Sequence, residues 1–137
     1  MRPLIHPATL LLLAATLGGC AGVSNMTFTD DAGTGNQPFP TNYRSELLAF
    51  FRTYLTDPVG VRDAMMADPL QRSIGGRQRY VSCLRFNARK SDGSYIGIRD
   101  RVVVYVDARL DRIMEEPGDT CAGVNYQPFP ELEKLTR

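Results

Sequence analysis

The chain has 137 residues with 16 basic and 15 acidic side chains, and its formal net charge at pH 7 is +1. This balance gives no general attraction for nucleic acid or other acidic polymers. The only histidine, His6, lies near the N-terminus, and the chain has three cysteines. These counts argue against Ser-His-Asp or Cys-His catalysis and against a zinc site. We therefore expect no enzyme activity, no catalytic residue, no metal site and no cofactor.

A short apolar segment begins the chain. Arg2 is the only charged residue before residue 20, and an apolar run extends from Ala8 to Gly19. As a helix this run would be about 18 Å long, which is too short to span roughly 30 Å of bilayer hydrocarbon. A positive start, a short apolar region and a small-residue end are typical of a secretory signal. Residues 1–19 are interpreted as a signal peptide, whose removal takes away His6.

The end of this leader has a more specific pattern. Leu17, Gly18, Gly19 and Cys20 resemble the lipobox of bacterial lipoproteins. The resemblance implies that Cys20 receives diacylglycerol, becomes the new N-terminus and is acylated there, and two or three acyl chains anchor a protein where one binds only marginally. Ala21 in place of Asp implies, by the same resemblance, the outer membrane. An ordinary signal peptide cut near Gly19 and an uncleaved anchor are the alternatives.

The next segment, residues 20–40, has no helical or strand period and is rich in Gly, Thr, Asn and Asp. It is interpreted as a lipidated flexible tether that leads to one small domain over residues 41–137. If Cys20 carries lipid, Cys83 and Cys121 are the two cysteines that remain. Exported proteins meet an oxidising environment, which favours a Cys83–Cys121 disulfide. Two separate thiols are the alternative.

The first predicted element of the domain is an amphipathic helix of about 14 residues after Thr41, which ends near Thr56 because Pro58 follows. A second short helix is predicted over Val59–Ala67. Strands are predicted over residues 77–88, 99–108 and 109–116, the last two joined by a turn at Asp107 and Ala108. A short helix follows Pro130. Apolar residues repeat along one face of the first helix: Tyr43, Leu47, Phe51, Tyr54 and Leu55.

Together these elements predict an α+β domain. One long amphipathic helix packs on a small three-stranded antiparallel meander, and one disulfide ties the C-terminal segment to the strand at 77–88.

A second resemblance covers about residues 42–135. The pattern is a helix ending in Asp-Pro, a Val-x-Cys strand running into Asn-Ala, a turn with Tyr and Gly, and a valine-rich strand. It resembles a family of small, largely uncharacterised proteobacterial envelope lipoproteins, and it implies a shared fold and no known activity. The matching positions are Asp57, Pro58, Cys83, Asn87, Ala88, Tyr95 and Gly97.

The segment 77–90 contains the candidate binding residues. It is basic, with Tyr80 and Phe86 among its charges, and in an exported protein such a patch could bind anionic groups. A solvated strand face whose arginines pair with nearby acids is the simpler interpretation, and Asn87 is expected mainly to hydrogen-bond the turn that follows it. The candidate binding residues are Arg79, Arg85, Asn87, Arg89 and Lys90.

The sequence therefore predicts a non-enzymatic envelope protein, held to the membrane by acyl chains at Cys20 and facing the periplasm. It would act by contact, as an accessory or structural partner of another envelope protein, and would not bind nucleic acid. One alternative is a binding module for an anionic envelope component, lipopolysaccharide or peptidoglycan, through residues 77–90. An enzyme that uses carboxylates is a third hypothesis.

Overall fold

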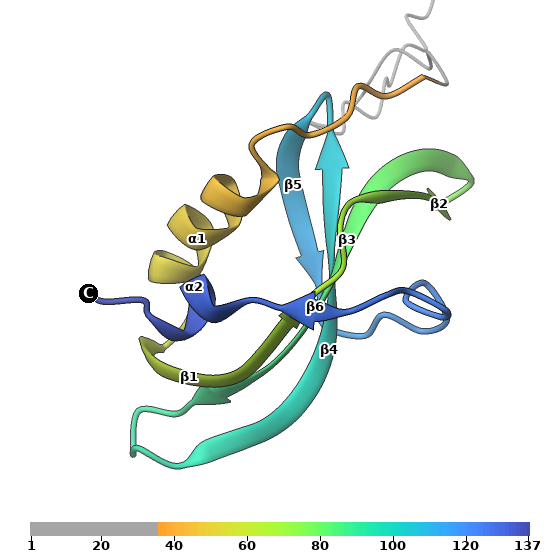
Figure 1. Cartoon of the computed structure of the whole chain (residues 1–137). Helices are drawn as coiled ribbons and strands as arrows, with labels where there is room; N and C mark the ends of the chain where they lie inside the picture. The colour runs from red at the N-terminus through yellow and green to blue at the C-terminus, as the bar shows by residue number, and fades with distance from the viewer. Residues whose placement is uncertain (1–35) are drawn as a thin grey trace, which may run out of the picture.

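The computed structural model describes residues 36–137 (Figure 1). The predicted signal peptide, Cys20 and the first part of the tether lie outside the described residues. The described elements are, in chain order, α1 (Tyr43–Tyr54), β1 (Asp57–Met66), β2 (Leu70–Ile74), β3 (Arg77–Arg89), β4 (Tyr95–Val106), β5 (Arg109–Met114), β6 (Gln127–Pro128) and α2 (Pro130–Glu133).

The strands form one antiparallel sheet in the order β5-β4-β3-β1-β6. Because β4 occupies one edge of β3, β1 and β2 share the other: β1 pairs with the end of β3 and β2 with its beginning. A break separates β1 from β2 at residues 67–69, where Pro69 has no N–H to donate. The Ala67 N–H still donates to the Cys83 carbonyl oxygen (2.9 Å), so the two strands follow β3 almost continuously.

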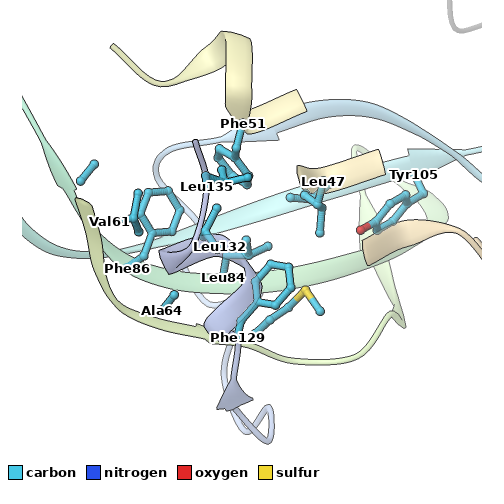
Figure 2. Close-up of a cluster of buried hydrophobic side chains, with 13 residues drawn as sticks. Leu47, Phe51, Val61, Ala64, Leu84, Phe86, Tyr105, Phe129, Leu132 and Leu135 are labelled. Atoms are coloured by element: carbon cyan, nitrogen blue, oxygen red, sulfur yellow. The ribbon is translucent and has the colours of Figure 1, made fainter. Parts of the chain in front are cut away.

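One face of the sheet is covered by the helices. Leu47 and Phe51 of α1 are fully buried there, and Phe51 meets Phe86 of β3 with 5.2 Å between ring centroids. Figure 2 shows these side chains with Phe129 and Leu132, which come from the C-terminal segment. Burial of this apolar surface is the main energetic reason for the helices to pack here.

The opposite face has a smaller apolar cluster. Val81, Cys83, Val102 and Val104 are fully buried there, although neither α1 nor α2 lies over them. The segment 115–126, which follows β5, supplies the cover and is tied down by a disulfide between Cys83 and Cys121 (Cα–Cα 5.8 Å). The predicted disulfide is confirmed. Figure 1 shows α1 and this segment on opposite sides of the sheet.

The predicted fold class, a long helix on a three-stranded meander, is wrong: the sheet has six strands and α1 has 12 residues. The helix predicted over Val59–Ala67 is mostly the strand β1. Gly60 has φ +80° and Asp63 has φ 56°, which is left-handed backbone that a right-handed helix does not contain. Pairing along the second edge of β3 decides the conformation, because β3 would otherwise expose a row of unpaired backbone groups.

Other predicted elements are confirmed. The strands expected at 77–88 and 109–116 correspond to β3 and β5, and the strand expected at 99–108 is the second half of β4. Asp107 and Ala108, with φ 49° and 63°, form the two-residue turn between β4 and β5 that the right-handed twist of a hairpin requires. α1 and α2 also lie where helices were predicted.

We predict that the paired substitution Cys83→Ala and Cys121→Ala lowers the free energy of unfolding by about 3–4 kcal/mol, since the bond closes a long loop in the unfolded chain. Urea denaturation followed by far-UV circular dichroism measures this difference. The unsubstituted protein with a reductant serves as the control and should lose a similar amount. Equal stability of the oxidised and reduced forms would contradict the prediction.

Candidate functional site

The described chain reaches the sheet at one end, which we call the proximal end: residues 37–40 with the β2–β3 and β4–β5 turns. The side chain of Gln37 is buried, and its Oε1 accepts a hydrogen bond from the backbone N–H of Asp107 (2.8 Å). The Phe39 ring lies edge-on to Tyr80 of β3, with 5.3 Å between centroids. Packing against the domain therefore includes Gln37, which belongs to the segment that the sequence assigned to the tether.

The other end of the sheet, which we call the distal end, comprises the β3–β4 turn (residues 90–94) and the first half of β1 (residues 57–62). It lies at the far end of β4 from the β4–β5 turn (Figure 1). At roughly 3.3 Å per residue, a strand the length of β4 spans about 40 Å. The two ends therefore face different surroundings.

A buried carboxylate holds the distal end together. The side chain of Asp57 is only 8% exposed, and Arg89 donates to its Oδ2 from Nε (2.8 Å) and Nη2 (2.5 Å). The Val59 N–H donates to Oδ1 (3.1 Å), and Arg137 approaches the same oxygen (3.4 Å). Hydrogen bonding from Arg89, the main cause, holds the pKa of Asp57 below its ordinary value, because these contacts favour the charged form.

Tyr95 links β4 to β1 beside this pair. Its hydroxyl donates to the Gly60 carbonyl oxygen (2.8 Å), and the Arg62 guanidinium lies 4.2 Å from the centre of its ring. Gly60 has positive φ, and a Cβ there would lie 3.4 Å from the Tyr95 hydroxyl oxygen. A short distance along β3, the Asn87 Oδ1 accepts a hydrogen bond from the backbone N–H of Gly97 (2.8 Å), which lies on β4 beyond the β3–β4 turn.

These contacts give a physical meaning to the sequence pattern quoted above. Asp57, Asn87, Tyr95 and Gly97 all lie where β1, β3 and β4 meet, and Asp57, Asn87 and Tyr95 make their contacts through side chains. Cys83 forms the disulfide, and Ala88 is buried in the core beneath the helices. The pattern thus describes how the distal junction and the disulfide are built.

The candidate binding residues do not gather into one patch. Arg79 is 7% exposed near the β2–β3 turn, and six residues of strand, about 20 Å, separate it from Arg85. Arg85 is bound to Asp100 at 2.6 and 3.0 Å and lies over the Tyr126 ring. Arg89 is bound to Asp57 as described, and Lys90 is exposed in the β3–β4 turn. Anion binding by these residues stays a prediction.

An open sheet edge near the distal end was missed in the sequence. β5 pairs with Val102–Val106 of β4, and among residues 36–137 no strand pairs with the same edge of β4 between Tyr95 and Arg101. Ile96 is 36% exposed and Ile98 is 55% exposed on this stretch. The predicted strand began at residue 99, so both isoleucines fell outside it. The available signal was that Ile96 and Ile98 alternate with other residues just before the valine run that begins at Val102, which extends the strand pattern toward the N-terminus.

An open hollow of about 700 Å³ adjoins this edge. Two of its three acids are engaged: Asp100 is bound by Arg85, and Glu115 accepts hydrogen bonds from Arg101 (2.8 Å) and from the Tyr54 hydroxyl. The Arg85 hydrogen bond, the main cause, lowers the pKa of Asp100, whereas a general acid at neutral pH needs a raised one. The hollow suits recognition by contact. Its lining comprises Arg85, Ile98, Arg99, Asp100, Glu115, Glu116, Pro117 and Gly118.

No protein-family model, no curated protein and no solved structure matches this chain. Within residues 36–137, no helix is both long and apolar enough to cross a membrane. In the same part of the chain, no group of three or more His, Cys, Asp or Glu side chains is placed to hold a metal ion.

We predict that Asp57 makes the stability of the domain depend on acidic pH. Its pKa is lowered in the folded state from the ordinary 3.8, so the stabilisation is complete above that pH and is lost as the pH falls through the lowered pKa. Asp57→Asn should lower the urea midpoint at neutral pH and reduce its loss between neutral pH and pH 3. The measurement is a series of urea denaturations across this range.

Asp63→Asn is the matched control for this series. Asp63 lies on the same strand, is exposed and has positive φ, a conformation that asparagine tolerates. It should leave the midpoint nearly unchanged at neutral pH. Equal midpoints for the two variants would show that the buried ion pair does not stabilise the distal junction.

Proposed function

We propose that the protein is a lipid-anchored envelope protein that faces the periplasm and acts by contact with another envelope protein. The observation that carries the proposal is the Cys83–Cys121 disulfide, because such bonds persist mainly in oxidising compartments outside the cytosol. The third cysteine of the chain is Cys20, which ends the segment that resembles a lipobox. Export and lipidation account for all three cysteines together.

The placement of the two ends supports an anchored arrangement. Gln37 joins the proximal end through Asp107, so a membrane anchor at Cys20 would hold this end near the bilayer. The distal end would then point away from the membrane by about the length of β4, roughly 40 Å. This geometry presents the distal end to partners in the periplasm, and Ala21 favours the outer membrane as the anchoring site.

The contact surface that we propose is the open edge of β4 from Tyr95 to Arg101. Exposed apolar side chains of this kind mark interaction sites when they lie on a firm support, and an unpaired edge can accept a strand from a partner. Here the support is the junction formed by Asp57, Arg89 and Tyr95. The partner is a protein, since backbone pairing and apolar contact are what an edge with Ile96 and Ile98 can offer.

The alternative, an anionic envelope component bound through residues 77–90, has weaker support. Arg85 and Arg89 are held by Asp100 and Asp57, and binding a ligand through them would mean exchanging one anion for another. Arg79 lies at the opposite end of the strand from Lys90. An enzyme that uses carboxylates has no more support, because two of the three acids of the hollow, Asp100 and Glu115, are bound by Arg85, Arg101 and Tyr54.

We predict that Cys20→Ala releases the protein from the membrane. The unsubstituted chain should stay in the membrane fraction after washing at high salt, since two or more acyl chains anchor a protein stably, whereas the variant should not be acylated at residue 20. Ser24→Ala, in the same segment, is the control and should stay membrane-bound. Mass spectrometry of the mature N-terminus checks the modification directly, and an unmodified Cys20 thiol there would refute the anchor.

We also predict that the partner contacts the β4 edge. A photo-crosslinking amino acid at Ile98 should capture a specific envelope protein in intact cells, and the same probe at Ser73, exposed on β2 at the proximal end, should not capture it. Ile98→Asp should reduce capture by a probe at Ile96 at least ten-fold, because it places a charge in an apolar contact. Identical capture from positions 73 and 98 would argue against a distal contact surface.

A further inference from the structure

Two arginines beside the open β4 edge carry charge that no acid balances. Arg62 lies on β1 and Arg99 on β4, and both side chains are exposed. In the described part of the chain, neither guanidinium forms an ion pair with a carboxylate. By contrast, Arg85, Arg89 and Arg101 are each bound by an aspartate or a glutamate. The charges of Arg62 and Arg99 are therefore available to a partner.

The pairing of the strands brings Arg62 to this edge. Arg62 of β1 is opposite Asn87 of β3, and Asn87 is opposite Ile98 of β4. Residues directly opposite each other in adjacent strands project from the same face of a sheet, so Arg62 and Ile98 share a face. The Arg62 guanidinium lies over the Tyr95 ring on β4, 4.2 Å from its centre. This cation–π contact holds the guanidinium near the edge and leaves its charge in place.

Arg99 lies on the other face of the same edge. It is opposite Phe86, whose side chain packs in the core beneath the helices, and successive side chains of a strand alternate between the two faces. Beside it, no heavy atom lies within 4 Å of the position that a Cβ on Gly97 would take, so a partner chain can approach the backbone here. A strand added to this edge would therefore meet an arginine on each face.

We infer that the β4 edge binds an acidic, extended protein segment. The inference rests on the proposed function, because it names the chemistry of the partner at that same edge. An extended segment can pair with the open backbone of β4, with an apolar side chain against Ile98 and carboxylates near Arg62 and Arg99. Since Ile98 and Arg99 are neighbours on opposite faces, the partner needs an acidic residue next to an apolar one.

Glu116 provides a check of the opposite sign. It lines the hollow beside the edge and is exposed, and within residues 36–137 it forms no ion pair. An acidic segment at the edge is repelled by this carboxylate. Its removal should therefore strengthen binding, whereas removal of either arginine should weaken it.

Synthetic peptides are the probes, and the full-length protein is the receptor. The acidic probe is a fluorescently labelled peptide of sequence Thr-Glu-Val-Thr-Glu-Val-Thr. A second peptide has glutamine in place of both glutamates. A third keeps the glutamates and carries N-methyl groups on successive backbone amides, which removes the donors that strand pairing needs. Fluorescence anisotropy measures the Kd of each peptide.

We expect the acidic peptide to bind, less tightly at high salt, and the other two peptides to bind about ten-fold more weakly. Arg62→Gln and Arg99→Gln should each raise the Kd of the acidic peptide about three-fold, and together about ten-fold. Glu116→Gln should lower this Kd about two-fold. Lys90→Gln removes an exposed cation from the β3–β4 turn; it is the matched control and should leave the Kd nearly unchanged. Arg99→Gln alone keeps the test valid if loss of Arg62 disturbs the packing of Tyr95.

Equal binding of the glutamate and glutamine peptides, or no binding of either, would overturn the inference. Equal binding of the N-methylated peptide would also overturn it, because it would show an anion site that works without strand pairing, as for an acidic polysaccharide or a lipid headgroup.

The photo-crosslinking probe at Ile98 separates this inference from the proposed function. In cells, Arg99→Gln should reduce the capture that this probe gives. Capture that Arg99→Gln leaves unchanged would overturn the acidic segment and keep the contact surface. Absence of any capture in the unsubstituted protein would refute the contact surface in the envelope, whereas the peptide measurements would still decide the chemistry of the edge.

Discussion

The Cys83–Cys121 disulfide is the constraint on which the rest of the structure depends. A sheet buried on both faces needs two covers, and here only one of them is helical. The other is the irregular segment 115–126, whose apolar contribution is limited to a few side chains such as Val124 and Tyr126. Without the bond to Cys83, this segment would have to hold its position over Val81, Val102 and Val104 by a small apolar contact and a few polar ones, such as those from Arg72 and Arg101.

The sequence predicted those parts of the fold that local signals determine. The amphipathic repeat located α1, and the run of valines located the second half of β4. β1 was predicted as a helix because Asp57-Pro58 resembles a helix start, whereas its strand conformation depends on pairing with residues 84–89, which lie 18 to 32 positions later in the chain. Long-range pairing of this kind leaves no local period, particularly where register shifts at positions such as Gly60 and Asp63 interrupt it.

In the candidate site, too, local sequence signals predicted some features, and other features arise only from long-range contacts in the fold. The pairing of the cysteines followed from cysteine chemistry. The partners of the arginines did not, because Asp57 meets Arg89 only through the fold. The open edge of β4 was hidden for a further reason: it exists because β5 ends its pairing at Val102, and the chain then turns away to form the disulfide-bonded cover. Thus the bond that completes the core also leaves the edge exposed.

The central claim is therefore that one bond holds segment 115–126 in place. Within the segment, the Thr120 and Ala122 amides donate to carbonyl oxygens at Pro117 and Asp119 (3.0 and 2.9 Å). Amide hydrogen exchange on oxidised and reduced protein, under conditions where α1 stays folded, tests the claim most directly. The account predicts that reduction removes the protection of these two amides while the Leu55 amide, which closes α1, keeps its own. Unchanged protection of Thr120 and Ala122 after reduction would contradict it.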